Sequence, residues 1–174
     1  MSKQSQKEKL EVKEKTLEEK KLEQKEFLRL SIIAGLKHNE IVNSLEKRLV
    51  ASSTDYDKIE KEHYYQYLNA DIFGECDLHA IFYSDKNKYL LCFEVKATHD
   101  SLNKKRAMVQ LYKDKHYYSK MFKPKRVFTF YVYGDSDQYV IKWISSKQLE
   151  VANKNYSKIV NLKNKLHEYD HAYK

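Results

Sequence analysis

Two strand-like runs, residues 75–83 and 88–97, are separated by only four residues, and this spacing constrains the fold more than any other feature. Both runs are rich in apolar and aromatic residues, whereas the segment between them is polar. A short polar connection between two such runs predicts an antiparallel β-hairpin. Because side chains alternate along a strand, Glu94 and Lys96 share one face while Phe93 and Val95 point into the core.

The segments around this hairpin predict further helices and strands. Residues 28–49 have apolar positions at helical spacing, with a possible interruption near Gly35 and Asn39. Asp100 or Ser101 can cap a helix that runs to about residue 121, before Pro124. Strands are expected at 63–68, 127–133 and 139–144, a loop at 52–61, and a helix at 154–173. This order predicts a mixed α/β domain.

The chain is expected to divide into a charged helical extension, residues 1–27, and a domain, residues 28–174. The first 26 residues hold eight Lys and seven Glu, without Gly or Pro, which favours a solvated helix. The leucines of this segment do not keep heptad spacing, so they give little support to a coiled coil. The absence of an apolar leader or a long apolar stretch predicts an intracellular, cytoplasmic protein without a membrane partner, and a viral or plasmid origin is expected.

Positive charge is concentrated in residues 101–126, where nine Lys or Arg accompany one acid, Asp114. Clustered cations bind a polyanion by releasing its condensed counterions, so this segment predicts a phosphate-binding surface. The alternative is an ordinary solvated helix face. The residues expected to contact DNA are Lys104, Lys105, Arg106, Lys113 and Lys115.

Paired carboxylates on the hairpin are the strongest candidates for chemistry. In the expected register Asp77 comes close to Glu94, and two neighbouring carboxylates repel each other unless a cation lies between them. Oxygen ligands favour Mg²⁺ or Mn²⁺, and Lys96 can stabilise negative charge that develops on a phosphate. The alternative is an exposed ion pair between Glu94 and Lys96 on the hydrated face of the sheet.

Other chemistries have weaker support in the sequence. Cys76 and His79 have the spacing of half a zinc site, but an odd offset on a strand directs them to opposite faces. Two cysteines are too few for an iron–sulfur cluster, and no Gly-rich phosphate loop indicates a nucleotide cofactor.

Taken together, the motifs resemble the PD-(D/E)XK nuclease superfamily, in particular its archaeal and viral branch of Holliday-junction-resolvase-like and RecB-like enzymes. The motifs are GECDL at 74–78, FEVKA at 93–97 and QL at 110–111. The resemblance implies a restriction-endonuclease-like αβββαβ core, a mixed central sheet flanked by helices. It assigns catalysis to Asp77, Glu94, Lys96 and Gln110, and metal binding to Asp77, Glu94, the Val95 carbonyl and Glu40.

The expected function is metal-dependent hydrolysis of phosphodiester bonds in DNA, on branched or junction DNA in particular. The alternative is a non-catalytic nucleic-acid-binding module that keeps the nuclease-like fold. A single set of motifs cuts one strand, so a homodimer is expected. Its apolar contact is expected from the strand at 128–133 or from a C-terminal stripe of Tyr156, Ile159, Leu166, Tyr169 and Tyr173.

Overall fold

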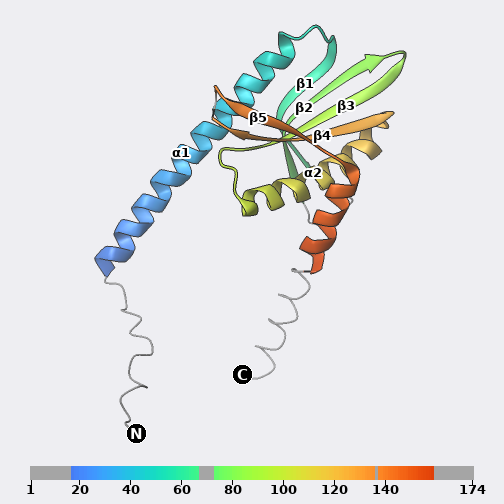
Figure 1. Cartoon of the computed structure of the whole chain (residues 1–174). Coiled ribbons are helices and arrows are strands. Elements are labelled where there is room, and N and C mark those ends of the chain that lie inside the picture. The colour runs from blue at the N-terminus through green and yellow to red at the C-terminus, as the bar shows by residue number, and fades with distance from the viewer. Residues whose placement is uncertain (1–16, 67–72, 136, 159–174) are drawn as a thin grey trace. The chain divides into compact units, whose positions relative to one another are not determined.

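The computed structural model describes residues 17–66, 73–135 and 137–158. Along the chain the elements are α1 (Leu17–Val50), β1 (Tyr56–Gln66), β2 (Phe73–Ser84), β3 (Asn87–Lys96), α2 (Ser101–Phe122), β4 (Arg126–Gly134) and β5 (Tyr139–Ile144) (Figure 1). Residues 146–158 are also helical. The chain forms two compact units, Met1–Ala34 and Gly35–Lys174, which are described separately below.

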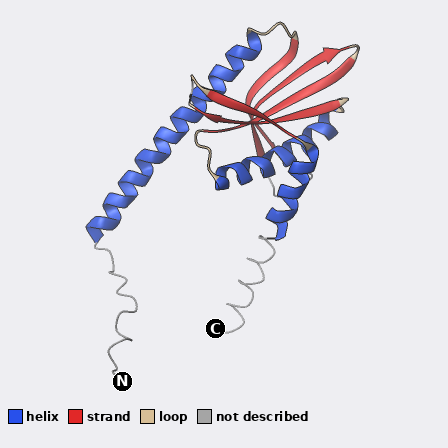
Figure 2. Cartoon of the chain, viewed as in Figure 1, coloured by secondary structure: helices blue, strands red, loops and turns tan. Residues whose placement is uncertain are grey.

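The strands of the larger unit, drawn red in Figure 2, form one mixed sheet. Their order in the sheet is β1-β2-β3-β4-β5. All neighbouring pairs are antiparallel except β3 and β4, which are parallel and are connected through α2. A parallel connection needs such a crossover, because the chain has to return to the starting edge of the sheet. The predicted α/β class, with a mixed sheet flanked by helices, is confirmed.

Two apolar cores lie on the two faces of the sheet. On one face Ile41, Val42 and Leu45 of α1 pack against Leu78 and other residues of the central strands. On the other face α2 packs against the same strands, and its buried residues include Ala107, Met108, Leu111 and Tyr118. Both faces of β2 and β3 are therefore covered.

Two elements differ from the sequence-based expectation. The polar residues 52–61 were expected to form a loop, but β1 begins at Tyr56. It is an edge strand, so charged residues such as Asp57 and Lys61 remain in solvent while the backbone pairs with β2. The expected interruption near Gly35 and Asn39 is also wrong, because α1 is continuous to Val50.

The two segments expected to form a homodimer contact differ in how far the structure describes and exposes them. The segment 128–133 lies in β4, which is paired on both sides and contributes buried side chains to the cores. Tyr156 is exposed, whereas Ile159, Leu166, Tyr169 and Tyr173 lie outside the described residues. Exposed apolar side chains are present on β5, namely Val140, Ile141 and Trp143. The homodimer itself stays a prediction.

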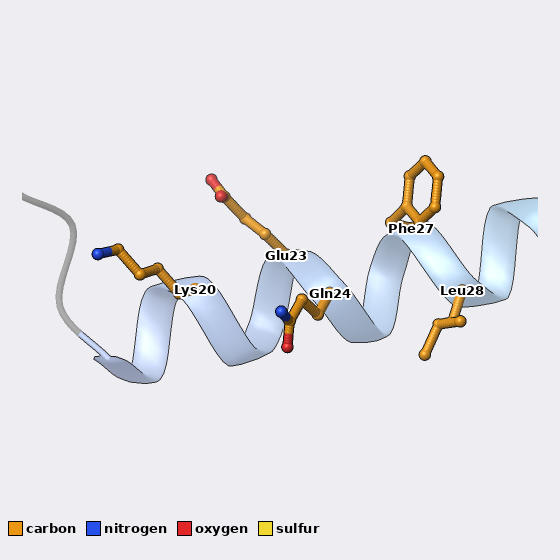
Figure 3. A pocket seen from close by; sticks show the side chains of 5 residues that line it. All are labelled: Lys20, Glu23, Gln24, Phe27 and Leu28. Atoms are coloured by element: carbon orange, nitrogen blue, oxygen red, sulfur yellow. The ribbon is translucent and has the colours of Figure 1, made fainter. Parts of the chain in front are cut away.

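The smaller unit is helical in its described part. Lys20, Glu23, Gln24, Phe27 and Leu28 border a shallow surface site on α1 (Figure 3). These side chains all leave a single helix, and Phe27 and Leu28 are largely exposed. None of the helices in the described ranges is both long enough and apolar enough to cross a membrane.

Gly74 and Gly35 provide a matched test of how tightly the chain packs around each position. A Cβ at Gly74 would lie 2.3 Å from the buried Tyr65 ring, whereas a Cβ at Gly35 would meet nothing within 4 Å. We expect Gly74→Ala to destabilise the protein by about 1–3 kcal/mol through overpacking. Gly35→Ala should instead stabilise α1 by up to about 1 kcal/mol, through its higher helix propensity. Urea unfolding of both variants measures the change in the free energy of unfolding. A change of the same sign in Gly74→Ala and Gly35→Ala would contradict this account.

Candidate active site

The site begins where the ladder between β2 and β3 ends. Backbone pairing of these strands runs from Ser84↔Asn87 to Leu78↔Phe93. Beyond that point the carboxylate of Asp77 accepts the Val95 N–H, with a distance of 2.6 Å from Oδ2 to N. A side chain on β2 thus replaces a backbone carbonyl as the partner of β3, which fixes Asp77 next to the strand that carries Glu94 and Lys96.

Glu94 and Lys96 lie together, as their spacing on β3 predicts. Lys96 Nζ donates to Glu94 Oε1 at 2.5 Å and lies 4.0 Å from Asp77 Oδ2. The alternative of an exposed ion pair on a hydrated sheet face is wrong, because Glu94 is only 4% exposed and Asp77 only 5%. Burial makes this different from a surface ion pair, since charges removed from water have to be compensated by neighbouring groups.

The electrostatics of this cluster favour one additional positive charge. Burial raises the pKa of Glu94 well above its ordinary value, and the neighbouring charge of Asp77 adds to this effect. Burial opposes the charge of Lys96, but Glu94 and Asp77 outweigh it and raise the Lys96 pKa. Glu94 Oε2 is buried and has no hydrogen-bond partner among the described residues. Two carboxyls, one ammonium and an unpartnered oxygen fit a divalent cation held by Asp77 and Glu94.

His38 of α1 joins the cluster, although the sequence motifs did not identify it. Its Nε2 lies 3.2 Å from Asp77 Oδ2, and this hydrogen bond raises the His38 pKa. Helical spacing could have placed His38 on the face of α1 that packs on the sheet, because it precedes the buried Ile41, Val42 and Leu45. Glu40, expected to reach the metal, is exposed and interacts electrostatically with Lys37. The structure therefore brings His38 to Asp77, and the metal-binding role of Glu40 stays a prediction.

Gln110 lies in a neighbouring buried network. Its side-chain amide donates to the Glu75 carbonyl at 2.7 Å and to Asp114 Oδ1 at 3.0 Å. The Tyr65 hydroxyl donates to the same Asp114 oxygen. The hydrogen bonds of Gln110 therefore hold Asp114 and β2, and its expected place beside Lys96 stays a prediction, as does the metal-binding role of the Val95 carbonyl.

The cations of α2 lie on more than one of its sides. Asp100 caps the helix as predicted, since its Oδ1 accepts the N–H groups of Leu102 and Asn103. Lys105 and Arg106 are exposed near this end. Lys104 and Lys113 are half-buried, and Lys115 is also half-buried and donates to the Ser146 hydroxyl. Among the five residues expected to contact DNA, Lys105 and Arg106 are therefore the more accessible to a phosphate ligand.

Side-chain alternation is interrupted where β1 passes Asp77. The register pairs Lys61 with Leu78 and His63 with Cys76, so Glu62 lies opposite Asp77. Glu62 has a φ of 50°, which is unusual for a residue with a side chain. On β2 the interruption directs Cys76 and His79 to the same side, where Tyr118 contacts both. The expectation that these two residues face opposite sides is therefore wrong.

Comparison with known proteins gives no assignment. No family model matches the chain, and the search of curated proteins finds no match. One solved structure, described as "Crystal structure of SSO0001", is 13% identical with a TM-score of 0.37, over 80% of this chain and 68% of that one.

Asp114 allows a prediction on stability and pH. Burial raises its pKa from 3.8 to about 8, so at neutral pH the folded state binds a proton that the unfolded state releases. The contribution of this proton is complete below pH 4 and is lost as the pH rises through about 8. We expect Asp114→Asn to reduce the pH slope of the unfolding free energy between pH 5 and 7.5 by up to about 1.4 kcal/mol per pH unit. Urea unfolding measures the slope.

Exposed Asp57 supplies the control for this experiment. Asp57→Asn makes the same chemical change without the buried network, and its pH slope should equal that of the unmodified protein. An unchanged slope in Asp114→Asn would show that this carboxyl does not hold the proton.

Proposed function

We propose that the protein is a metal-dependent deoxyribonuclease whose active site contains Asp77, Glu94 and Lys96. The observation that supports the proposal best is the unpartnered, buried Glu94 Oε2 beside a second carboxylate and an ammonium group. An ordinary structural ion pair would satisfy its buried oxygens within the protein. The resemblance of the motifs to PD-(D/E)XK nucleases supports the same chemistry.

Each side chain has a distinct task in this mechanism. Asp77 and Glu94 would hold Mg²⁺ or Mn²⁺, which lowers the pKa of a bound water and offsets charge on the scissile phosphate. Lys96, kept protonated by the two carboxylates, supplies positive charge where negative charge develops on the phosphate. His38 restrains the Asp77 carboxylate from the side of α1, and the Val95 N–H restrains it from β3.

Binding of DNA is assigned to the N-terminal part of α2. Helix α2 follows β3 after a short connection, so Lys104, Lys105 and Arg106 come soon after Lys96 in the chain. Cations placed there can bind the phosphates that flank a scissile bond. A branched substrate and a homodimer belong to the same proposal, since resolution of a junction needs two cuts.

The catalytic prediction concerns Asp77→Asn, Glu94→Gln and Lys96→Ala. Each variant should lose at least about 100-fold in cleavage rate, the order expected when a group that stabilises transition-state charge is removed. Cleavage is measured on linear duplex, single strand, flap and four-way junction with Mg²⁺, Mn²⁺ or EDTA. Binding measured by fluorescence anisotropy should persist, because phosphate affinity is assigned to α2.

Glu150→Gln and Lys142→Ala repeat these chemical changes at exposed positions and should keep full activity. Unimpaired cleavage by all three site variants, with normal circular dichroism, would eliminate the proposed site. Binding to DNA without cleavage of any substrate would identify the protein as a non-catalytic module instead.

A separate prediction concerns Lys104, Lys105 and Arg106 replaced together by Ala. Each phosphate contact contributes about 0.9 to the slope of log affinity against log salt concentration on duplex DNA. We expect weaker binding to all sequences and a slope that is lower by about one to three such contacts. The charge-matched control replaces Lys47, Arg48 and Lys86, which are outside α2, and an equal loss in both variants would show that α2 has no special role.

A further inference from the structure

A second cluster of metal-binding side chains lies apart from the carboxylate pair, on the side of the sheet that α2 covers. Its members are Glu60 and His63 of β1 and His79 of β2, and one ligand atom from each lies within 4.8 Å of the other two. Glu60 and His63 are three residues apart, so regular alternation would separate them. The positive φ of Glu62 interrupts that alternation and allows both to face His79.

The two distances from Glu60 to the histidines are close to those between ligand atoms of a coordination shell. Glu60 Oε2 lies 3.1 Å from His63 Nδ1 and 3.3 Å from His79 Nε2. In a tetrahedral zinc site with bonds of about 2.0–2.1 Å, the ligand atoms are about 3.3–3.4 Å apart. Two imidazoles and one carboxylate are a set that zinc and similar transition metals accept, whereas Mg²⁺ selects oxygen ligands.

The side of His79 that faces α2 is held by Tyr118. The Tyr118 hydroxyl lies 3.1 Å from His79 Nδ1. The two rings are also in contact, with centroids 4.8 Å apart. These contacts orient the imidazole so that its other nitrogen, Nε2, is directed to Glu60.

The Nε2 atom of His79 lies 3.3 Å from Glu60 Oε2. His79 is completely buried, and its Nε2 has no hydrogen-bond partner among the described residues. A buried polar atom without a partner is unfavourable, and a cation between the imidazole and the carboxylate would satisfy both groups. A hydrogen bond to the far nitrogen of a ligating histidine, here from the side of Tyr118, commonly orients the ring in a metal site.

We propose that Glu60, His63 and His79 bind one divalent transition-metal ion of the zinc class. Three protein ligands leave one coordination position, on the side where Glu60 and His63 are partly exposed. The ion links β1 to β2 and is independent of the proposed nuclease site. Lys58 Nζ, 2.6 Å from Glu60 Oε2, neutralises this carboxylate when the metal is absent and competes with the ion.

Titration of the metal-free, full-length protein with Zn²⁺ in a calorimeter tests the proposal, with Co²⁺ as the spectroscopic probe. We expect one tightly bound ion per chain and visible absorption typical of tetrahedral Co²⁺. Glu60→Gln and His63→Ala should each weaken binding by at least about 100-fold, and Tyr118→Phe by about 10–100-fold. Lys58→Ala should instead tighten binding, because the competing ammonium is lost.

His116→Ala removes an exposed histidine and should leave Zn²⁺ binding unchanged. Asp77→Asn and Glu94→Gln should also leave it unchanged, which separates this site from the proposed nuclease site. The partly exposed position of His63 makes its variant informative where His79→Ala fails to fold. Equal Zn²⁺ affinity in His63→Ala and the unmodified protein, or loss of binding in Glu94→Gln, would overturn the proposal.

Discussion

Burial of β2 and β3 between α1 and α2 determines where polar side chains can exist in this protein. A charged or polar group on a doubly covered strand loses its hydration, so it has to be compensated by a partner or a cation. Asp77 on β2 and Glu94 on β3 meet this condition, and Asp114 of α2 is buried in the same way. The partners that compensate these acids come from α1, α2 and the strands, and this is why the candidate site depends on the complete layered fold.

The degree of compensation differs among these groups, and the difference indicates which of them are structural. Asp114 receives hydrogen bonds from Tyr65 and Gln110, and its raised pKa keeps it protonated at neutral pH. A neutral, hydrogen-bonded acid can remain inside a core at modest cost. One oxygen of each acid, Asp114 Oδ2 and Glu94 Oε2, has no hydrogen-bond partner among the described residues. Glu94 differs in having a charged partner, Lys96, on its other oxygen and a second carboxylate, Asp77, nearby, an arrangement that a bound cation would complete.

Sequence patterns predicted the parts of the structure that depend on local periodicity. The hairpin, α2 with its Asp100 cap, and the pairing of Glu94 with Lys96 follow from alternation and capping over a few residues. Only the last part of β1 was predicted, by the strand expected at 63–68, because the first part of this exposed edge strand has the polar composition of a loop. The contact between His38 and Asp77 depends on how α1 packs on the sheet, which motif spacing does not contain.

A single backbone irregularity connects the two clusters of metal-binding side chains. Glu62 and Asp77 lie opposite each other, and alternation changes on both strands at this position. On β2 the change allows Asp77 to bond to β3 and His38 while His79 faces Tyr118. On β1 it brings Glu60 and His63 to the same side. With regular alternation on both strands, Asp77 would share the face of His79, and Glu60 would be separated from His63. The positive φ of Glu62 therefore accompanies both arrangements of candidate ligands, in a backbone conformation that favours glycine.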